Sequence, residues 1–158
     1  MQLYKIWKCL YRLEVLKPDW TDLLKKHEQK LYRELSQEEY EELSQEFAVY
    51  YREKEYEYEQ LLMYFIFTYF CGAVYDRDAF SKVKLAVVST LLIRELDLAV
   101  WLEQDKQFAF EDQIEVAHRY AREVEHSDPN MEAMETMMAG EEFFKQEHLL
   151  DAALGLVI

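Results

Sequence analysis

The chain has 158 residues and a net charge of −14, from 32 acidic and 18 basic residues. This length fits one domain that can bury a core, and an apolar fraction of 51% is too high for a disordered chain. The acidic balance argues against nucleic acid and an anionic membrane surface as partners, since both bind clustered Lys and Arg. With three glycines and two prolines, the sequence lacks turn residues for many short strands and predicts an all-α protein.

Helical spacing and capping signals place three helices in the first third of the chain. Apolar side chains recur at helical intervals between residues 3 and 13, which predicts a first helix. Pro18 suits the first turn of a second helix, and Ser36 with Glu39 forms a capping box that opens a third. In residues 53–59, EKEYEYE, glutamate alternates with other residues, and this pattern leaves two possibilities open: a short break, or a bend in one long helix.

Two segments that are apolar nearly all round follow at residues 58–75 and 80–102. A helix without a polar face belongs in the middle of a bundle. The short connection at residues 76–78 predicts that the two helices pair as an antiparallel hairpin. The charge-free run 61–75 is short for a membrane span and is typical of a buried helix. We therefore expect a central buried hairpin and no membrane association.

The last third of the chain predicts further helices around this hairpin. Residues 103–109 indicate a loop, and helical spacing predicts a sixth helix at about 111–126. Pro129 lies at the start of a seventh helix, and residues 143–154 can form a last one. We expect one all-α domain covering residues 1–158, a bundle of about seven to eight helices around the central buried helical hairpin.

Three charged residues, Arg94, Glu95 and Asp97, interrupt the second apolar segment. Charges in a buried helix must be paired or must face a cavity. Two interpretations stay open at this point. The residues line a polar pocket between helices, or they form a buried ion-pair network in which Arg122 is one partner.

Two ExxH motifs lie in the predicted sixth helix, Glu115 with His118 and Glu123 with His126. Helical di-iron proteins use such motifs because residues i and i+3 share one face of a helix. Here both motifs fall on one helix, about 12 Å apart at the usual helical rise. One pair of metal ions cannot bridge them, so we predict no metal site; the weaker alternative is a site for a single ion, which would need ligands from elsewhere in the chain.

A second pattern overlaps these motifs. His118, Arg122 and Glu125 lie at i, i+4 and i+7 along the border of the apolar face. Such a mixture of charges could orient a substrate or the backbone of a partner. It is more often a salt-bridged rim that holds a helix against its neighbours.

The same segment carries a family resemblance. Residues 117–127, AHRYAREVEHS, followed by Asn130, resemble the signature H-x-Y-S-R-E-x-E-H-S-x-x-N of bacterial flagellin lysine-N-methylases (FliB-type proteins), with Ala121 where serine is usual. Residues 58–94 are similar, in the same order, to the central helices of that family. Residues 13–20 are similar to the start of its C-terminal region. The resemblance covers most of this chain but only the C-terminal part of a typical family member.

The resemblance implies a protein-lysine N-methyltransferase that modifies flagellin and uses S-adenosylmethionine as the methyl donor. Family members also carry a cysteine-rich N-terminal region, and no counterpart of it occurs here. Cys9 and Cys71 lie far apart and do not replace it. They fit two reduced thiols in a cytoplasmic protein. We therefore expect a domain that is incomplete for catalysis by itself.

The candidate catalytic cluster follows from the positions that match the signature. His118 or His126 could take a proton from a lysine ammonium, and the carboxylates could hold that ammonium. The alternative is a non-enzymatic acidic domain that recruits flagellin or another protein. The candidate residues are His118, Tyr120, Arg122, Glu123, Glu125, His126 and Asn130, with Arg94 and Asp97 in support.

Overall fold

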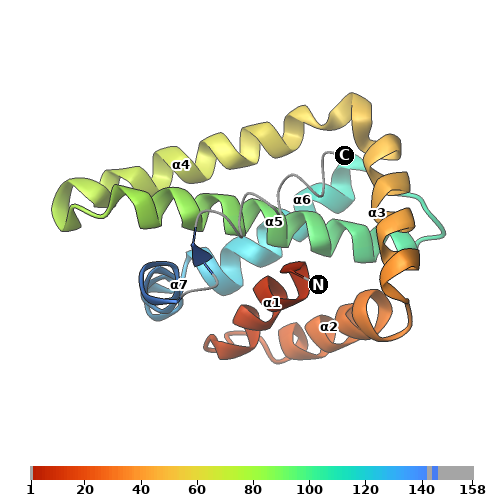
Figure 1. Cartoon of the computed structure of the whole chain (residues 1–158), viewed down its shortest axis with the longest axis horizontal. Coiled ribbons are helices and arrows are strands. Elements are labelled where there is room, and N and C mark those ends of the chain that lie inside the picture. Colours follow the sequence, from red (N-terminus) through yellow and green to blue (C-terminus); the bar gives the residue numbers. More distant parts are fainter. Residues whose placement is uncertain (1, 142–143, 146–158) are drawn as a thin grey trace.

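The computed structural model describes residues 2–141 and 144–145, and within these residues every regular element is helical (Figure 1). The all-α prediction is therefore confirmed. The last predicted helix, at 143–154, lies almost wholly outside the described residues. The α-helices are α1 (Gln2–Trp7), α2 (Pro18–Glu28), α3 (Gln37–Tyr51), α4 (Tyr56–Asp76), α5 (Ala79–Glu103), α6 (Phe110–Tyr120) and α7 (Asp128–Gly140). Short 3₁₀ turns, η1 (Lys8–Arg12) and η3 (Arg52–Lys54), and π-helical turns, η2 (Gln29–Arg33) and η4 (Ala121–Glu125), extend or join them.

Local sequence explains where the helices begin. The Ser36 hydroxyl accepts a hydrogen bond from the Glu39 N–H at 3.2 Å, and the Glu39 carboxylate accepts one from the Ser36 N–H at 2.8 Å. This is the predicted capping box at the start of α3. The Ser127 side chain caps α7 in the same way, by accepting from the Asn130 N–H. The ambiguous stretch 53–59 contains a break, because η3 separates α3 from α4.

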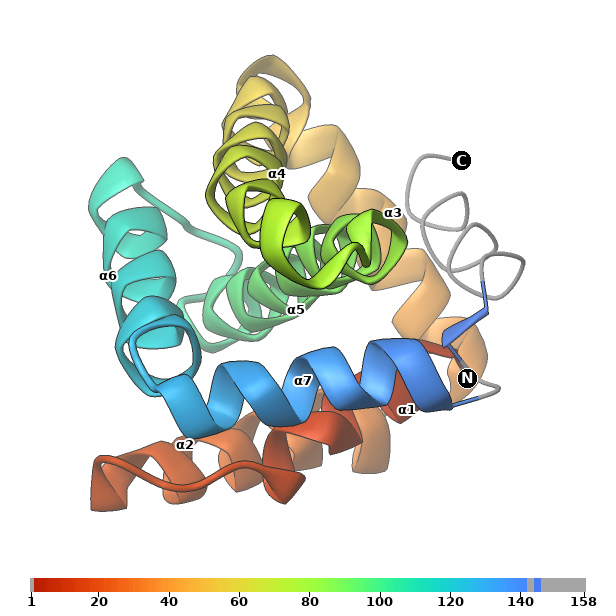
Figure 2. The ribbon, with the colours of Figure 1, turned by 90° about the vertical axis from the view of Figure 1, so that its left-hand side faces the viewer.

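Helix α5 forms the centre of the molecule and packs against each of the other six described α-helices. Figure 2 shows α3, α4, α6 and α7 arranged around it. Every residue of α5 from Leu91 to Ala99 is buried, and so is Trp101. The expectation that residues 80–102 occupy the middle of the bundle is confirmed.

The predicted hairpin is present, but only its second helix is central. Helix α4 runs antiparallel along α5 (Figure 1) and buries Phe65 and Tyr69. Its opposite face is exposed, and Phe67 there keeps 69% of its surface accessible. An apolar composition all round a helix therefore does not require burial on every side. Among the described helices, none combines the length and the apolarity that crossing a membrane requires.

Candidate functional site

The segment that carries the family signature bends through a π-helical turn. Helix α6 continues into η4, which is closed by a hydrogen bond of 2.8 Å from the His126 N–H to the Ala121 carbonyl. The Ser127 cap then starts α7. The predicted helix at 111–126 is thus one continuous element whose last turn is wider than an α-helical turn. Such π turns are rare and occur frequently at functional sites.

Two of the candidate residues form a buried clamp. The Asn130 Nδ2 donates to the carbonyls of Glu14 at 2.9 Å and Glu123 at 2.7 Å, and its Oδ1 accepts from the Glu14 N–H at 2.7 Å. The Glu123 Oε2 accepts from the N–H groups of Leu16 at 3.1 Å and Lys17 at 3.4 Å. These bonds fasten the loop before α2 to the corner between η4 and α7. Asn130 and Glu123 therefore serve the fold directly.

Tyr120 is also an internal residue. Its ring is fully buried and lies edge-on to Phe65 of α4. Its hydroxyl donates to the Ser89 Oγ on α5 at 2.9 Å. Burial raises the pKa of Tyr120. This side chain joins α6 to α4 and α5 and does not reach the solvent.

The other four candidate residues of the signature reach the surface. His118 and His126 are exposed, whereas Arg122 and Glu125 are partly exposed. The Arg122 Nε lies 3.7 Å from the Glu123 Oε1, which is an ion pair too long for a hydrogen bond. The Glu125 Oε1 accepts a hydrogen bond of 2.7 Å from the hydroxyl of Tyr64 on α4. The signature thus presents two imidazoles, a guanidinium and an oriented carboxylate, which we call the surface edge (His118, Arg122, Glu125 and His126).

Arg94 belongs to a buried ion-pair network, so the second of the two open interpretations holds for it. Its Nη1 lies 3.3 Å from the Glu95 Oε1, and its Nη2 donates to the Ser44 carbonyl at 2.9 Å. Glu95 also accepts hydrogen bonds from the hydroxyls of Tyr32 and Tyr40. The network faces α3 and η2, and Arg122 is not among these partners.

Asp97 lies apart from the surface edge as well. Its Oδ2 accepts a hydrogen bond of 2.6 Å from the Tyr58 hydroxyl, and its Oδ1 is buried without a hydrogen-bond partner among the described residues. Burial raises the pKa of Asp97 well above its ordinary value of 3.8, and the bond from Tyr58 offsets this only in part. Eight residues of α5 separate Asp97 from Ser89, the partner of Tyr120, which is about 12 Å along the helix. The structure therefore brings neither supporting residue into contact with the signature segment.

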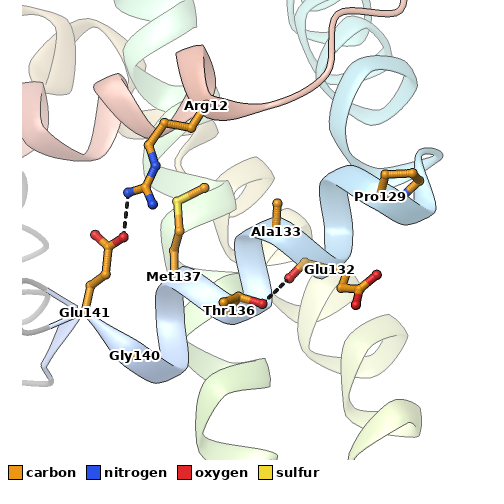
Figure 3. A pocket seen from close by; sticks show the side chains of 8 residues that line it. All are labelled: Arg12, Pro129, Glu132, Ala133, Thr136, Met137, Gly140 and Glu141. Carbon is orange, nitrogen blue, oxygen red and sulfur yellow. Dashed lines mark hydrogen bonds and ion pairs between the residues drawn. The ribbon is translucent and has the colours of Figure 1, made fainter.

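A shallow groove lies along α7, opposite the turn η1 (Figure 3). The Arg12 Nη1 and the Glu141 Oε1 form an ion pair of 2.5 Å at this groove. Sequence reasoning did not identify the groove, since none of the nine candidate residues lines it and its two charged partners are distant in sequence. The lining residues are Arg12, Pro129, Glu132, Ala133, Thr136, Met137, Gly140 and Glu141.

The groove along α7 does not fit S-adenosylmethionine, the methyl donor that the resemblance implies. A site for it needs a concave slot for the adenine ring and partners for the ribose and the charged amino-acid end. The groove along α7 is open, its guanidinium is already paired with Glu141, and a single glycine lines it. Among all the residues that the structure describes, no group of three or more His, Cys, Asp or Glu side chains could hold a metal ion.

Fold and site together define an all-helical domain with a clamped, π-turned signature segment. The chain belongs to the family of the FliB lysine N-methylase C-terminal domain, whose model matches residues 1–151. The family expectation drawn from residues 117–130 is thereby confirmed. The comparison with curated proteins and the comparison with solved structures each gave no match.

Proposed function

We propose that the chain takes part in the N-methylation of protein lysines as the domain that binds the lysine-bearing protein, for which flagellin is the expected substrate. Membership of the FliB family supports the reaction class. The poor fit of the groove along α7 to S-adenosylmethionine supports a role in binding the protein substrate and not in donating the methyl group. The net charge of −14 favours a partner that carries lysines.

The pair of Glu125 and Tyr64 is the observation that carries this proposal. A lysine ammonium has three hydrogen-bond donors and needs acceptors around it. The Tyr64 hydroxyl occupies one oxygen of Glu125 and holds the carboxylate in place, which leaves the other oxygen for an ammonium. The half-exposed ring of Tyr64 lies beside this carboxylate and can cover the methylene stem of a lysine.

The two exposed imidazoles give the surface edge a further capacity. A lysine amine attacks a methyl donor only after it has lost its proton, and a neutral imidazole can accept that proton. His118 and His126 lie on the same segment as Glu125. A second candidate function is recruitment of the substrate without any part in the chemistry. It is favoured because the groove along α7 does not fit S-adenosylmethionine, and it assigns no role to these imidazoles.

Isothermal titration calorimetry of flagellin monomers into the chain tests the binding role. We expect Glu125→Gln to weaken binding at least about tenfold, since a hydrogen bond to a charged group contributes about 1.5–3 kcal/mol. The matched control is Glu115→Gln, which removes the same charge from α6 at an exposed position whose partner is Arg119, 2.9 Å away. The control should bind as the unchanged chain does.

Two further measurements separate the alternatives. S-adenosylmethionine should give no binding heat with the chain alone, and the chain alone should transfer no methyl group to flagellin. Methyl transfer by the chain alone would contradict the proposal. Equal losses of flagellin affinity in Glu125→Gln and Glu115→Gln would contradict it as well. In an intact family protein that carries the matching substitutions, His118→Ala with His126→Ala should lower turnover if an imidazole takes the proton. Unchanged turnover would leave recruitment as the function.

A further inference from the structure

The outer face of α4 is an exposed apolar stripe that no other described element covers. Met63, Phe67 and Phe70 recur there at helical spacing, with exposed fractions of 50%, 69% and 46%. Phe80, in the first turn of α5 at the tip of the hairpin, is 53% exposed. We call these four residues the outer stripe. Between Glu59 and Asp76 the sequence contains no charged residue.

The size of the outer stripe suits a protein interface. If each of these side chains presents about 200 Å² when fully exposed, the stripe offers about 400 Å² of apolar surface. Each partner in a standard interface buries about 800 Å², of which a little over half is apolar. The stripe therefore supplies about the apolar share of one such interface.

The chemistry of the outer stripe indicates which partner fits it. A basic partner would need acidic side chains along the contact, and an anionic membrane would repel a chain of charge −14. The complement of an uncharged, straight, aromatic helix face is another face of the same kind. Helix α4 has a nearly symmetric pattern about Phe67, with Met63 four residues before it and Phe70 three residues after it.

We propose that the outer stripe is the interface of a homodimer, in which α4 of one copy packs antiparallel against α4 of a second copy. A two-fold axis near Phe67 sets Phe67 against its own counterpart and Met63 against Phe70. It also brings Glu59 of each copy toward Arg77 of the other. Because Asp76 and Asp78 flank Arg77, this charge pair adds little, and the apolar contact carries the affinity.

Light scattering coupled to size-exclusion chromatography tests this proposal on the 158-residue chain. At micromolar protein concentration, the expected molecular mass is twice the 19.2 kDa of one chain. Phe67→Glu should raise the dissociation constant at least about tenfold, since it places a charge at the centre of the contact. Val49→Glu is the matched control, since Val49 is exposed on α3, and it should remain dimeric. Circular dichroism verifies that both variants keep their helices.

A disulfide provides a second readout that does not depend on stability. Phe67→Cys in a Cys71→Ser background should form a covalent dimer under mild oxidation, because the two new thiols lie at the two-fold axis. Val49→Cys in the same background should not. The dissociation constant of the dimer should also fall as the salt concentration rises, because salt screens the repulsion between two chains of charge −14. A monomeric chain at all concentrations, or equal dissociation by Phe67→Glu and Val49→Glu, would overturn the proposal without affecting the flagellin titration.

Discussion

Asn130 illustrates how a polar residue of the family signature can serve the fold. Its side-chain amide makes three hydrogen bonds, two of them to the backbone of Glu14, which is 116 residues away in sequence. Glu123 and Tyr120 are equally enclosed. Of the seven candidate residues in the signature, three are buried and hold the segment in place, and four reach the surface. This division decides which substitutions should change stability and which should change binding.

Asn130→Ala is expected to destabilise the chain by about 2–4 kcal/mol, because it removes two part-buried hydrogen bonds to the backbone of Glu14 and the buried one to the Glu123 carbonyl. Urea unfolding followed by circular dichroism measures the change. Gln60→Ala, at an exposed position of α4, is the control and should stay within about 0.5 kcal/mol of the unchanged chain. A loss below about 1 kcal/mol for Asn130→Ala would contradict the clamp.

At the scale of the element, local signals located the helix starts well. The capping box at Ser36 and the proline in the first turn of α2 both occur where predicted. The outcome at residues 53–59 was not accessible to sequence, because alternating Glu and Tyr residues fit a helix and a break equally well. The π turn η4 was missed for a related reason, since a widened turn leaves no mark in the spacing of polar residues.

Ser36→Ala should destabilise the chain by about 1 kcal/mol, because the Glu39 N–H then has no side-chain acceptor at the start of α3. Chemical denaturation provides the measurement. Glu38→Ala removes an exposed neighbour that lies outside the capping box and should change the free energy of unfolding by no more than about 0.5 kcal/mol. Equal effects of the two substitutions would mean that the box contributes nothing of its own.

At the scale of the whole molecule, the distinctive feature is the number of carboxylates buried around α5. Glu95, Asp97 and Glu57 are all buried, and the nearby buried cation is Arg94. Tyrosine hydroxyls take the place of further cations: Tyr58 donates to Asp97, and Tyr51 donates to Glu57. This arrangement explains part of the high tyrosine content, and it makes the fold sensitive to the charge of Asp97.

Asp97→Asn tests this sensitivity through pH. Because the folded-state pKa of Asp97 is raised, its protonated form contributes stability that is present below about pH 3.8 and is lost as the pH rises through the folded-state value. The unchanged chain should therefore lose stability relative to Asp97→Asn as the pH rises above about 3.8, by about 1.4 kcal/mol for each pH unit until the raised folded-state pKa is passed. Urea unfolding at several pH values measures the difference, and a difference independent of pH would contradict the assignment.

The sequence by itself determined the helical class, most helix starts, the central position of α5 and the family, because periodicity, capping and a contiguous signature are local properties of the chain. Tertiary structure alone decided which signature residues are buried, since that depends on a loop more than 100 residues away meeting the π turn. It also decided the surroundings of Arg94 and Asp97, which lie on one helix but face different neighbours. Tertiary structure also decided that one face of α4 is exposed, because apolar composition sets the tendency of a helix to be buried and the available neighbours set which face is covered.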